Sequence, residues 1–237
     1  MDSIAANLQA VRARIARAAQ AAQRPAGDIL LLAVSKTIPA ERIAEAYAAG
    51  QRAFGENHAQ DAVEKITVLA TLPLEWPLLL PLEWHFIGPI QSNKARVIAQ
   101  HFGWVHSVER EKIAERLNSA RPDGMAPLNV CIQVNVSGEA TKSGVAPGEE
   151  AKLAEAIARL PRLRLRGLMA IPEPTADVTL QRRRFALLRE LKDGLRARGH
   201  ALDTLSMGMS DDFEAAILEG ATIVRIGTAI FGPRQRT

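Results

Sequence analysis

Short apolar runs alternate with longer amphipathic segments along almost the whole chain, and this alternation is the strongest constraint on its fold. The apolar runs are typical of strands buried on both faces, and they cover residues 29–35, 51–55, 83–87, 103–107, 128–136, 164–170, 203–207 and 222–227. Segments with helical periodicity lie between them, at 39–49, 57–70, 92–101, 109–119, 148–159, 178–198 and 211–219. About eight βα units in this order predict an α/β fold, a (β/α)8 TIM barrel, with a doubly wound open sheet as the alternative.

An extra N-terminal helix is expected before the first strand. Its apolar residues recur at helical spacing, as in a helix that packs one face on a core: Ile4, Leu8, Val11 and Ile15. The segment is also rich in arginine, like a mitochondrial transit peptide, but the regular apolar stripe favours a structural helix. No linker-like composition divides the chain, so we predict a single barrel domain over residues 1–237.

Composition and charge narrow the classes of function. Cys131 is the one cysteine of the sequence, which excludes an internal disulfide and a multi-cysteine metal site and is typical of the reducing cytoplasm. No apolar run of the sequence is long enough to span a membrane. The net charge of +4 leaves nucleic acid open as a partner, but the arginines at 162–166 and 182–184 have no interleaved aromatic residues. We expect neither a membrane nor a nucleic-acid partner, since positive potential also suits a small anionic ligand.

Lys36 follows the first predicted strand directly, at the end of the strand where α/β folds bind ligands. A lysine at the edge of an apolar core loses hydration, which favours the neutral amine that attacks a carbonyl carbon. The alternative is a lysine that ends a strand and extends its ammonium group into water. For this strand considered alone, the second interpretation is the better supported.

The loops after the last two predicted strands have the composition of anion sites. Gly208-Met209-Ser210 and Gly227-Thr228 place small residues and a hydroxyl before a helix, where backbone N–H groups are exposed. Barrels often bind phosphate in these two loops, although Ser210 and Thr228 are alternatively ordinary helix N-caps. Because the first and last strands of a closed barrel are neighbours, the ligand would carry both an aldehyde and a phosphate. Pyridoxal 5′-phosphate (PLP), held as a Schiff base on Lys36, is the candidate.

Several motifs between about Ile29 and Gly232 resemble those of the YggS/PROSC family of pyridoxal phosphate homeostasis proteins: LLAVSK, FGEN, WHFIGPIQSNK, GLMAI, SMGMSDDFEAAI and VRIGTAIFG. The resemblance implies a barrel like the N-terminal domain of alanine racemase, with PLP bound as a reversible Schiff base on Lys36. It also implies that Ser210, Gly227 and Thr228 bind the phosphate. By the same resemblance, Asn57, Met209 and Arg225 line the cofactor.

We expect a non-catalytic PLP-binding protein with a role in intracellular vitamin B6 homeostasis, and no catalytic residue or metal site. Arg225, placed near the ring nitrogen by the resemblance, disfavours the protonated ring that carbanion chemistry uses. A two-base racemase also needs a second acid–base group. Tyr47 falls on a helix face and Cys131 within a strand, so neither is expected to supply it. The alternative is a PLP-dependent amino-acid racemase, and a third possibility is a phosphate-binding barrel without Schiff-base chemistry.

Other residues and partners complete the expectations. The spacing of His85, His101 and His106 is not that of metal ligands, and we expect His85 at the mouth of the barrel. Lys142 is a second amine that competes for the aldehyde. PLP-dependent apoenzymes are the partners expected to receive cofactor. Related racemases have a second domain that contributes to their dimers, and without it we expect a cytoplasmic monomer.

Overall fold

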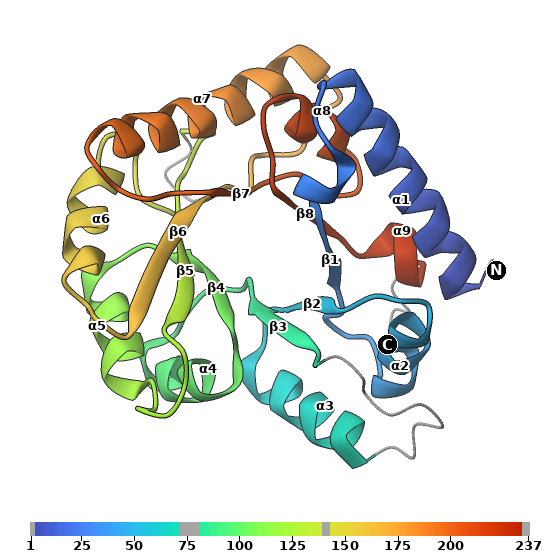
Figure 1. Ribbon diagram of the computed structural model, residues 1–237, viewed down its shortest axis with the longest axis horizontal. Coiled ribbons are helices and arrows are strands. Elements are labelled where there is room, and N and C mark those ends of the chain that lie inside the picture. The colour runs from blue at the N-terminus through green and yellow to red at the C-terminus, as the bar shows by residue number, and fades with distance from the viewer. Residues whose placement is uncertain (1–2, 72–80, 139–142, 234–237) are drawn as a thin grey trace.

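The strands of the computed structural model, which describes residues 3–71, 81–138 and 143–233, form one closed barrel. They are Leu30–Val34 (β1), Ala53–Glu56 (β2), Glu83–Phe86 (β3), Trp104–Val108 (β4), Leu128–Gln133 (β5), Leu163–Met169 (β6), Thr204–Ser206 (β7) and Ile223–Ile226 (β8). Neighbouring strands are parallel and follow chain order, and β8 pairs with β1 (Figure 1). The predicted (β/α)8 barrel is therefore confirmed, and the open sheet is excluded.

Helices form a ring around the barrel (Figure 1). They are Ile4–Ala21 (α1), Ala40–Ala48 (α2), Ala59–Thr71 (α3), Ala95–His101 (α4), Glu111–Ala120 (α5), Glu150–Ala158 (α6), Val178–Ala197 (α7), Phe213–Leu218 (α8) and Thr228–Phe231 (α9). Short 3-10 turns at Ala26–Asp28 and Ser92–Lys94 precede β1 and α4. The second of these turns explains why α4 begins later than its predicted start at residue 92.

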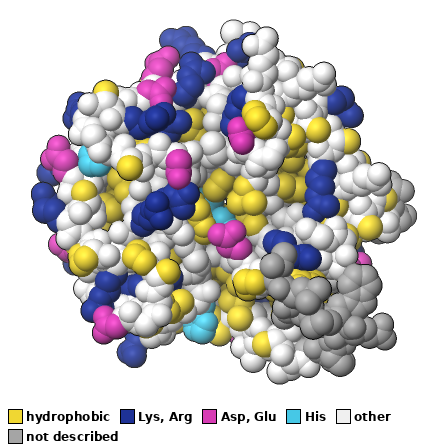
Figure 2. All heavy atoms as spheres, in the orientation of Figure 1, with side chains coloured by type: hydrophobic (Ala, Val, Ile, Leu, Met, Phe, Trp, Pro, Cys, Tyr) yellow, Lys and Arg dark blue, Asp and Glu magenta, His cyan; other side chains and the backbone are white. Residues whose placement is uncertain are grey.

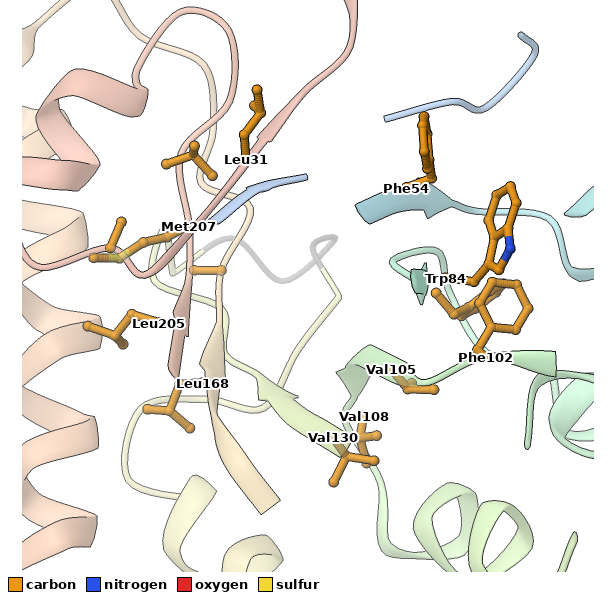
Figure 3. Packing of buried hydrophobic residues seen from close by; sticks show 14 of the residues in the cluster. Leu31, Phe54, Trp84, Phe102, Val105, Val108, Val130, Leu168, Leu205 and Met207 are labelled. Atoms are coloured by element: carbon orange, nitrogen blue, oxygen red, sulfur yellow. The ribbon is translucent and has the colours of Figure 1, made fainter. Parts of the chain in front are cut away.

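Side chains on the strands alternate between the helix layer and the barrel interior, as the pleat requires. Figure 3 shows outward-facing residues such as Leu31, Leu168 and Leu205 projecting toward the surrounding helices, where they are at most 8% exposed. A second apolar cluster is formed by Leu32, Ala53, Trp104, Cys131, Met169 and Ile223. Burying each large apolar side chain contributes about 1.5–3 kcal/mol, so the two layers hold the strand ends in place.

The predicted N-terminal helix is confirmed by α1. Its apolar stripe is at most 4% exposed, and consists of Ile4, Leu8, Val11 and Ile15. Hydrogen bonds tie this helix and the segment after it to the last part of the barrel. Asn7 Nδ2 of α1 donates to Ile230 O of α9 (2.9 Å), and Arg24 Nη1, beyond the end of α1, donates to Ala221 O before β8 (2.8 Å). The helix therefore packs beside α8 and α9, next to the strands that close the barrel (Figure 1).

Arginines of the two basic clusters lie in ion pairs. Arg166 contacts Asp203 at 2.7 Å, and Arg182 contacts Glu219 at the same distance. Such half-exposed pairs contribute little stability, but they neutralise charge on the surface. Over the described ranges, none of the helices has the length and apolar character needed to cross a membrane. Lys142 lies outside the described residues.

Candidate functional site

Lys36 lies in a tight turn directly after β1, at the carboxyl end of the strand as predicted. Ser35 N–H donates to Gly55 O of β2 at 3.0 Å, and Ile38 N–H closes the turn on Ser35 O at 3.0 Å. Thr37 has a φ of 64°, a value that β-branched residues rarely adopt. The Lys36 residue is half-buried, so the turn presents it at the rim of the barrel.

A buried charge pair behind this turn fixes its backbone. Lys65 Nζ, from α3, donates to Ser35 O and to Glu56 Oε1, both at 2.8 Å, while Ser35 Oγ donates to the same carboxylate oxygen at 2.6 Å. Glu56 is 1% exposed. A buried carboxylate needs such partners to offset its lost hydration, and here they also hold the residue before Lys36. This network was not predicted from the sequence, although an acidic residue, Glu56, at the end of an apolar predicted strand indicates a buried carboxylate that needs partners.

Asn57 follows β2, and its Oδ1 atom is buried without a hydrogen-bond partner in the described part of the chain. An unpaired buried acceptor costs about 1–3 kcal/mol, so this oxygen is suited to a donor group on a bound ligand. Gly88, after β3, packs directly on Asn57: a Cβ there would lie 2.3 Å from the Asn57 carbonyl oxygen. The close approach holds Asn57 at the rim.

The loop between β7 and α8 contains the predicted residues Met209 and Ser210, both half-buried. Gly208 has a φ of 93°, and a Cβ there would lie 2.7 Å from Ala216 Cβ. Glycine is therefore needed for this loop to pack on α8. Met209 N–H donates to Asp212 Oδ1 at 2.6 Å, which fixes the loop further.

The loop after β8 is short and passes close to β1. A Cβ on Gly227 would lie 3.1 Å from Val34 O, so the Gly227-Thr228 backbone approaches the strand that carries Lys36. Asp212 is the N-cap residue of α8, and Gly227 is that of α9. The interpretation of Ser210 and Thr228 as N-caps is therefore wrong: Ser210 precedes the N-cap of α8, and Thr228 is the first residue of α9.

Arg225 lies inside the barrel beneath these loops and is 3% exposed. Its guanidinium donates from Nη1 to Ser206 Oγ at 2.7 Å and from Nη2 to Ala170 O at 2.8 Å. Burial lowers the pKa of Arg225 to about 10, so the group remains a cation at neutral pH. Because both of these acceptors are uncharged, the cation gives this part of the barrel a positive potential.

The structure brings all the predicted cofactor residues to four adjacent strands, β7, β8, β1 and β2. Their order around the rim is Met209 and Ser210, then Arg225, Gly227 and Thr228, then Lys36, then Asn57. An amine, a buried cation, an unpaired acceptor and two small-residue loops therefore share one end of the barrel. This donor set fits an anionic ligand with a carbonyl group.

Two histidines of the sequence analysis lie elsewhere. His85 is fully buried, and its Nδ1 lies 2.9 Å from Nε2 of His106. The expectation that His85 lines the mouth is therefore wrong. Both residues occupy inward-facing positions of neighbouring strands, which the alternation along β3 and β4 would have indicated.

The cavities of the described structure differ in their relation to this rim. A cavity of about 140 Å³ adjoins Asn57 and is also lined by Phe86 and Lys94. A larger one, of about 730 Å³, is lined by residues of α4 and α5 such as Arg96 and Arg116, and by none of the rim residues. This larger cavity is therefore separate from the candidate site.

Comparison with known proteins gives matches over nearly the whole chain. The family model described as alanine racemase, N-terminal domain, matches residues 6–235. The pyridoxal phosphate homeostasis protein of Pseudomonas aeruginosa is 62% identical over 235 residues, with 99% of this chain and 97% of that protein covered. The protein of the same name from Escherichia coli is 53% identical over 241 residues, with 99% and 98% covered. PipY of Synechococcus elongatus, solved with PLP bound, superposes with a TM-score of 0.82 at 36% identity, covering 97% of this chain and 100% of that one.

Proposed function

This chain belongs to the alanine racemase N-terminal-domain family and, within it, to the pyridoxal phosphate homeostasis proteins, and from that premise we propose that it binds PLP for vitamin B6 homeostasis. The family resemblance inferred from the motifs is thereby confirmed. The binding of PLP to a relative, PipY, supports the choice of ligand. We propose further that PLP is held reversibly as a Schiff base on Lys36.

The observation that carries this proposal is the position of Lys36 on a fixed turn beside β8. Lys36 would hold the cofactor through its amine, which would condense with the aldehyde with loss of water, and hydrolysis would release the cofactor again. Backbone N–H groups and hydroxyls at Ser210, Gly227 and Thr228 bind the phosphate. Asn57, Met209 and Arg225 line the ring.

A carrier role is favoured over catalysis by the surroundings of the ring. When bound, PLP supplies an electron sink that is strongest with a protonated ring nitrogen, and the Arg225 cation opposes that proton. Two side chains considered as a second base are unsuited to that role. Cys131 lies inside the barrel, where burial raises the pKa of its thiol to about 12, so it stays protonated. Tyr47 is buried on α2 beneath the guanidinium of Arg52.

The wider role follows from the same chemistry. We propose one barrel domain that acts in the cytoplasm as a monomer and passes PLP to PLP-dependent apoenzymes. A nucleic-acid partner is disfavoured because arginines of both basic clusters, Arg166 and Arg182 among them, are paired with carboxylates.

A titration with PLP tests the Schiff base. The wild-type protein should develop the visible absorbance of an imine, and Lys36→Ala should abolish it because no other amine occupies this turn position. Lys152→Ala, which removes an exposed lysine of α6, is the matched control and should behave as wild type. Borohydride reduction followed by peptide mass mapping should place the label on Lys36. A wild-type protein that stays colourless, or a label on another lysine, would contradict the proposal.

Incubation of the PLP-loaded protein with enantiopure alanine in deuterated water separates the carrier from the racemase. We expect the alanine to keep its configuration and its α-proton. Product that is both racemised and deuterated at the α-carbon at a useful rate would favour the racemase instead.

A further inference from the structure

A continuous row of polar side chains crosses the barrel interior, from Arg225 to the start of β3. Ser206 Oγ, the acceptor for Arg225 Nη1, also lies 2.7 Å from His106 Nδ1. His106 Nε2 lies 2.9 Å from His85 Nδ1. His85 Nε2 is buried without a hydrogen-bond partner among the described residues, and it faces Glu83 Oε2 at the longer distance of 3.6 Å. The three middle residues are fully buried, whereas the Glu83 side chain is 47% exposed.

Glu83 belongs to the end of the barrel opposite the ligand rim. It is the first residue of β3, and parallel strands begin at the same end of a barrel. Looking down the barrel, Figure 2 shows a histidine side chain near the centre, with acidic and basic side chains close to it among hydrophobic ones. Arg225 contacts the row from the other side, near the carboxyl ends of β6 and β8. The row therefore joins the cofactor end of the barrel to its far end.

The chemistry of the two ends gives this row one direction. Arginine can only donate, so Ser206 Oγ accepts from Arg225, and the hydroxyl proton of Ser206 is available to be donated to His106 Nδ1. The His106 proton then lies on Nε2 and is donated to His85 Nδ1. The His85 proton likewise lies on Nε2, facing the Glu83 carboxylate. The acceptor atom of each hydroxyl or imidazole group therefore faces the Arg225 side of the row, and its proton faces the Glu83 side.

The surroundings of Glu83 and the histidines agree with that direction. Trp104 Nε1 donates to Glu83 Oε1 at 2.7 Å, and its ring stacks on His85 with centroids 5.4 Å apart. The nearby His85 ring lowers the pKa of Glu83, which keeps it a carboxylate. Burial lowers the pKa of both His85 and His106, so each is a neutral imidazole with one proton to place.

We propose that Ser206, His106, His85 and Glu83 form a positioning relay for Arg225, with every proton directed from the guanidinium toward the Glu83 carboxylate. The relay orients Arg225 and stabilises its charge, and so sets how strongly the rim holds the ring of PLP. This second statement rests on the proposed function, whereas the direction of the relay does not. Hydrogen bonds in such a chain polarise one another, which carries the effect of Glu83 across the barrel.

The direction is tested without cofactor, by NMR of protein labelled with [15N]histidine. Two-bond correlations distinguish a protonated from an unprotonated ring nitrogen. We expect His85 and His106 to be protonated on Nε2 and bare on Nδ1 near neutral pH. A proton on Nδ1 of either ring would overturn the relay.

The effect on the cofactor is tested by PLP titration of two variants. Glu83→Gln removes the terminal charge at nearly constant shape, and Ser206→Ala removes the hydroxyl that contacts both Arg225 and His106. Each should weaken PLP binding by about fivefold or more and shift the absorbance maximum of the bound cofactor. Glu83→Asp, which keeps the charge, should restore part of the loss.

Asp203→Asn is the matched control, because Asp203 begins the β7 region at the same end of the barrel and pairs with Arg166 outside the relay. It should leave PLP affinity and absorbance at wild-type values. If Glu83→Gln and Ser206→Ala bind PLP like Asp203→Asn, the positioning role is wrong. If the wild-type protein itself fails to bind PLP, the proposed function fails, and the NMR experiment still decides the direction of the relay.

Discussion

Lys36 is held in position by residues that do not themselves face the ligand. The ammonium group of Lys65 and the hydroxyl of Ser35 both bind the Glu56 carboxylate, and Lys65 also binds the Ser35 carbonyl. The amine at residue 36 therefore sits on a backbone fixed from behind by a charge pair. Because the backbone at residue 36 is already ordered, only the bonds of the lysine side chain remain to be ordered when a ligand binds. The amine is therefore positioned more precisely.

The backbone strain of the sharp turn is located at Thr37, so a substitution there should change the stability of the protein. Its φ of 64° is unfavourable for a β-branched residue but readily adopted by asparagine. We expect Thr37→Asn to raise the free energy of unfolding by about 1 kcal/mol, measured by urea denaturation. Thr37→Val is the matched control. It keeps the strain and loses the hydrogen bond from Thr37 Oγ1 to Lys36 O (2.5 Å), so it should lower stability.

At the scale of elements, the strands could be predicted because each is a short apolar run bounded by turn residues. The rim could be predicted in outline, since strand order alone places the residues after β1, β7 and β8 together. The polar interior could be predicted only in part. The alternation along β3 and β4 indicates that His85 and His106 face inward, but their contacts with each other and with Ser206 of the distant β7 depend on the register of the closed sheet.

A second prediction concerns Gly208 in the loop between β7 and α8. Gly208→Ala would place a methyl group 2.9 Å from Phe213 Cα in a backbone with φ of 93°. We expect a loss of about 2 kcal/mol or more in the free energy of unfolding and weaker PLP binding, because the loop must move away from α8.

Gly194→Ala is the control for that experiment. Gly194 lies within α7, and an added Cβ would meet no atom within 4 Å. Alanine should stabilise this helix by up to about 1 kcal/mol and leave PLP binding unchanged. Equal effects of the two substitutions, in a urea titration and a PLP titration, would show that the geometry of residue 208 has no special role.

For the whole molecule, the buried histidine pair predicts how stability depends on pH. Burial lowers the pKa of both rings below the value of about 6.5 expected for the unfolded chain. Below pH 6.5 the unfolded state therefore binds protons that the folded state does not, and stability falls as the pH falls. We expect a loss of about 1–2 kcal/mol per pH unit between pH 6.5 and 5.5, measured by urea unfolding without cofactor. A stability that stays constant over this window would contradict neutral histidines in the core.

The pairing of β1 with β8 has a consequence for the synthesis of the protein on the ribosome. Lys36 emerges early in synthesis, but Arg225 and the Gly227-Thr228 turn are among the last residues made. The pairing of β1 with β8, from Leu30 with Ile223 to Ala33 with Ile226, brings them together. The residues after β1 therefore wait for almost the whole chain to be made before β8 can pair beside them. The rim is assembled only when the barrel closes, at the end of synthesis.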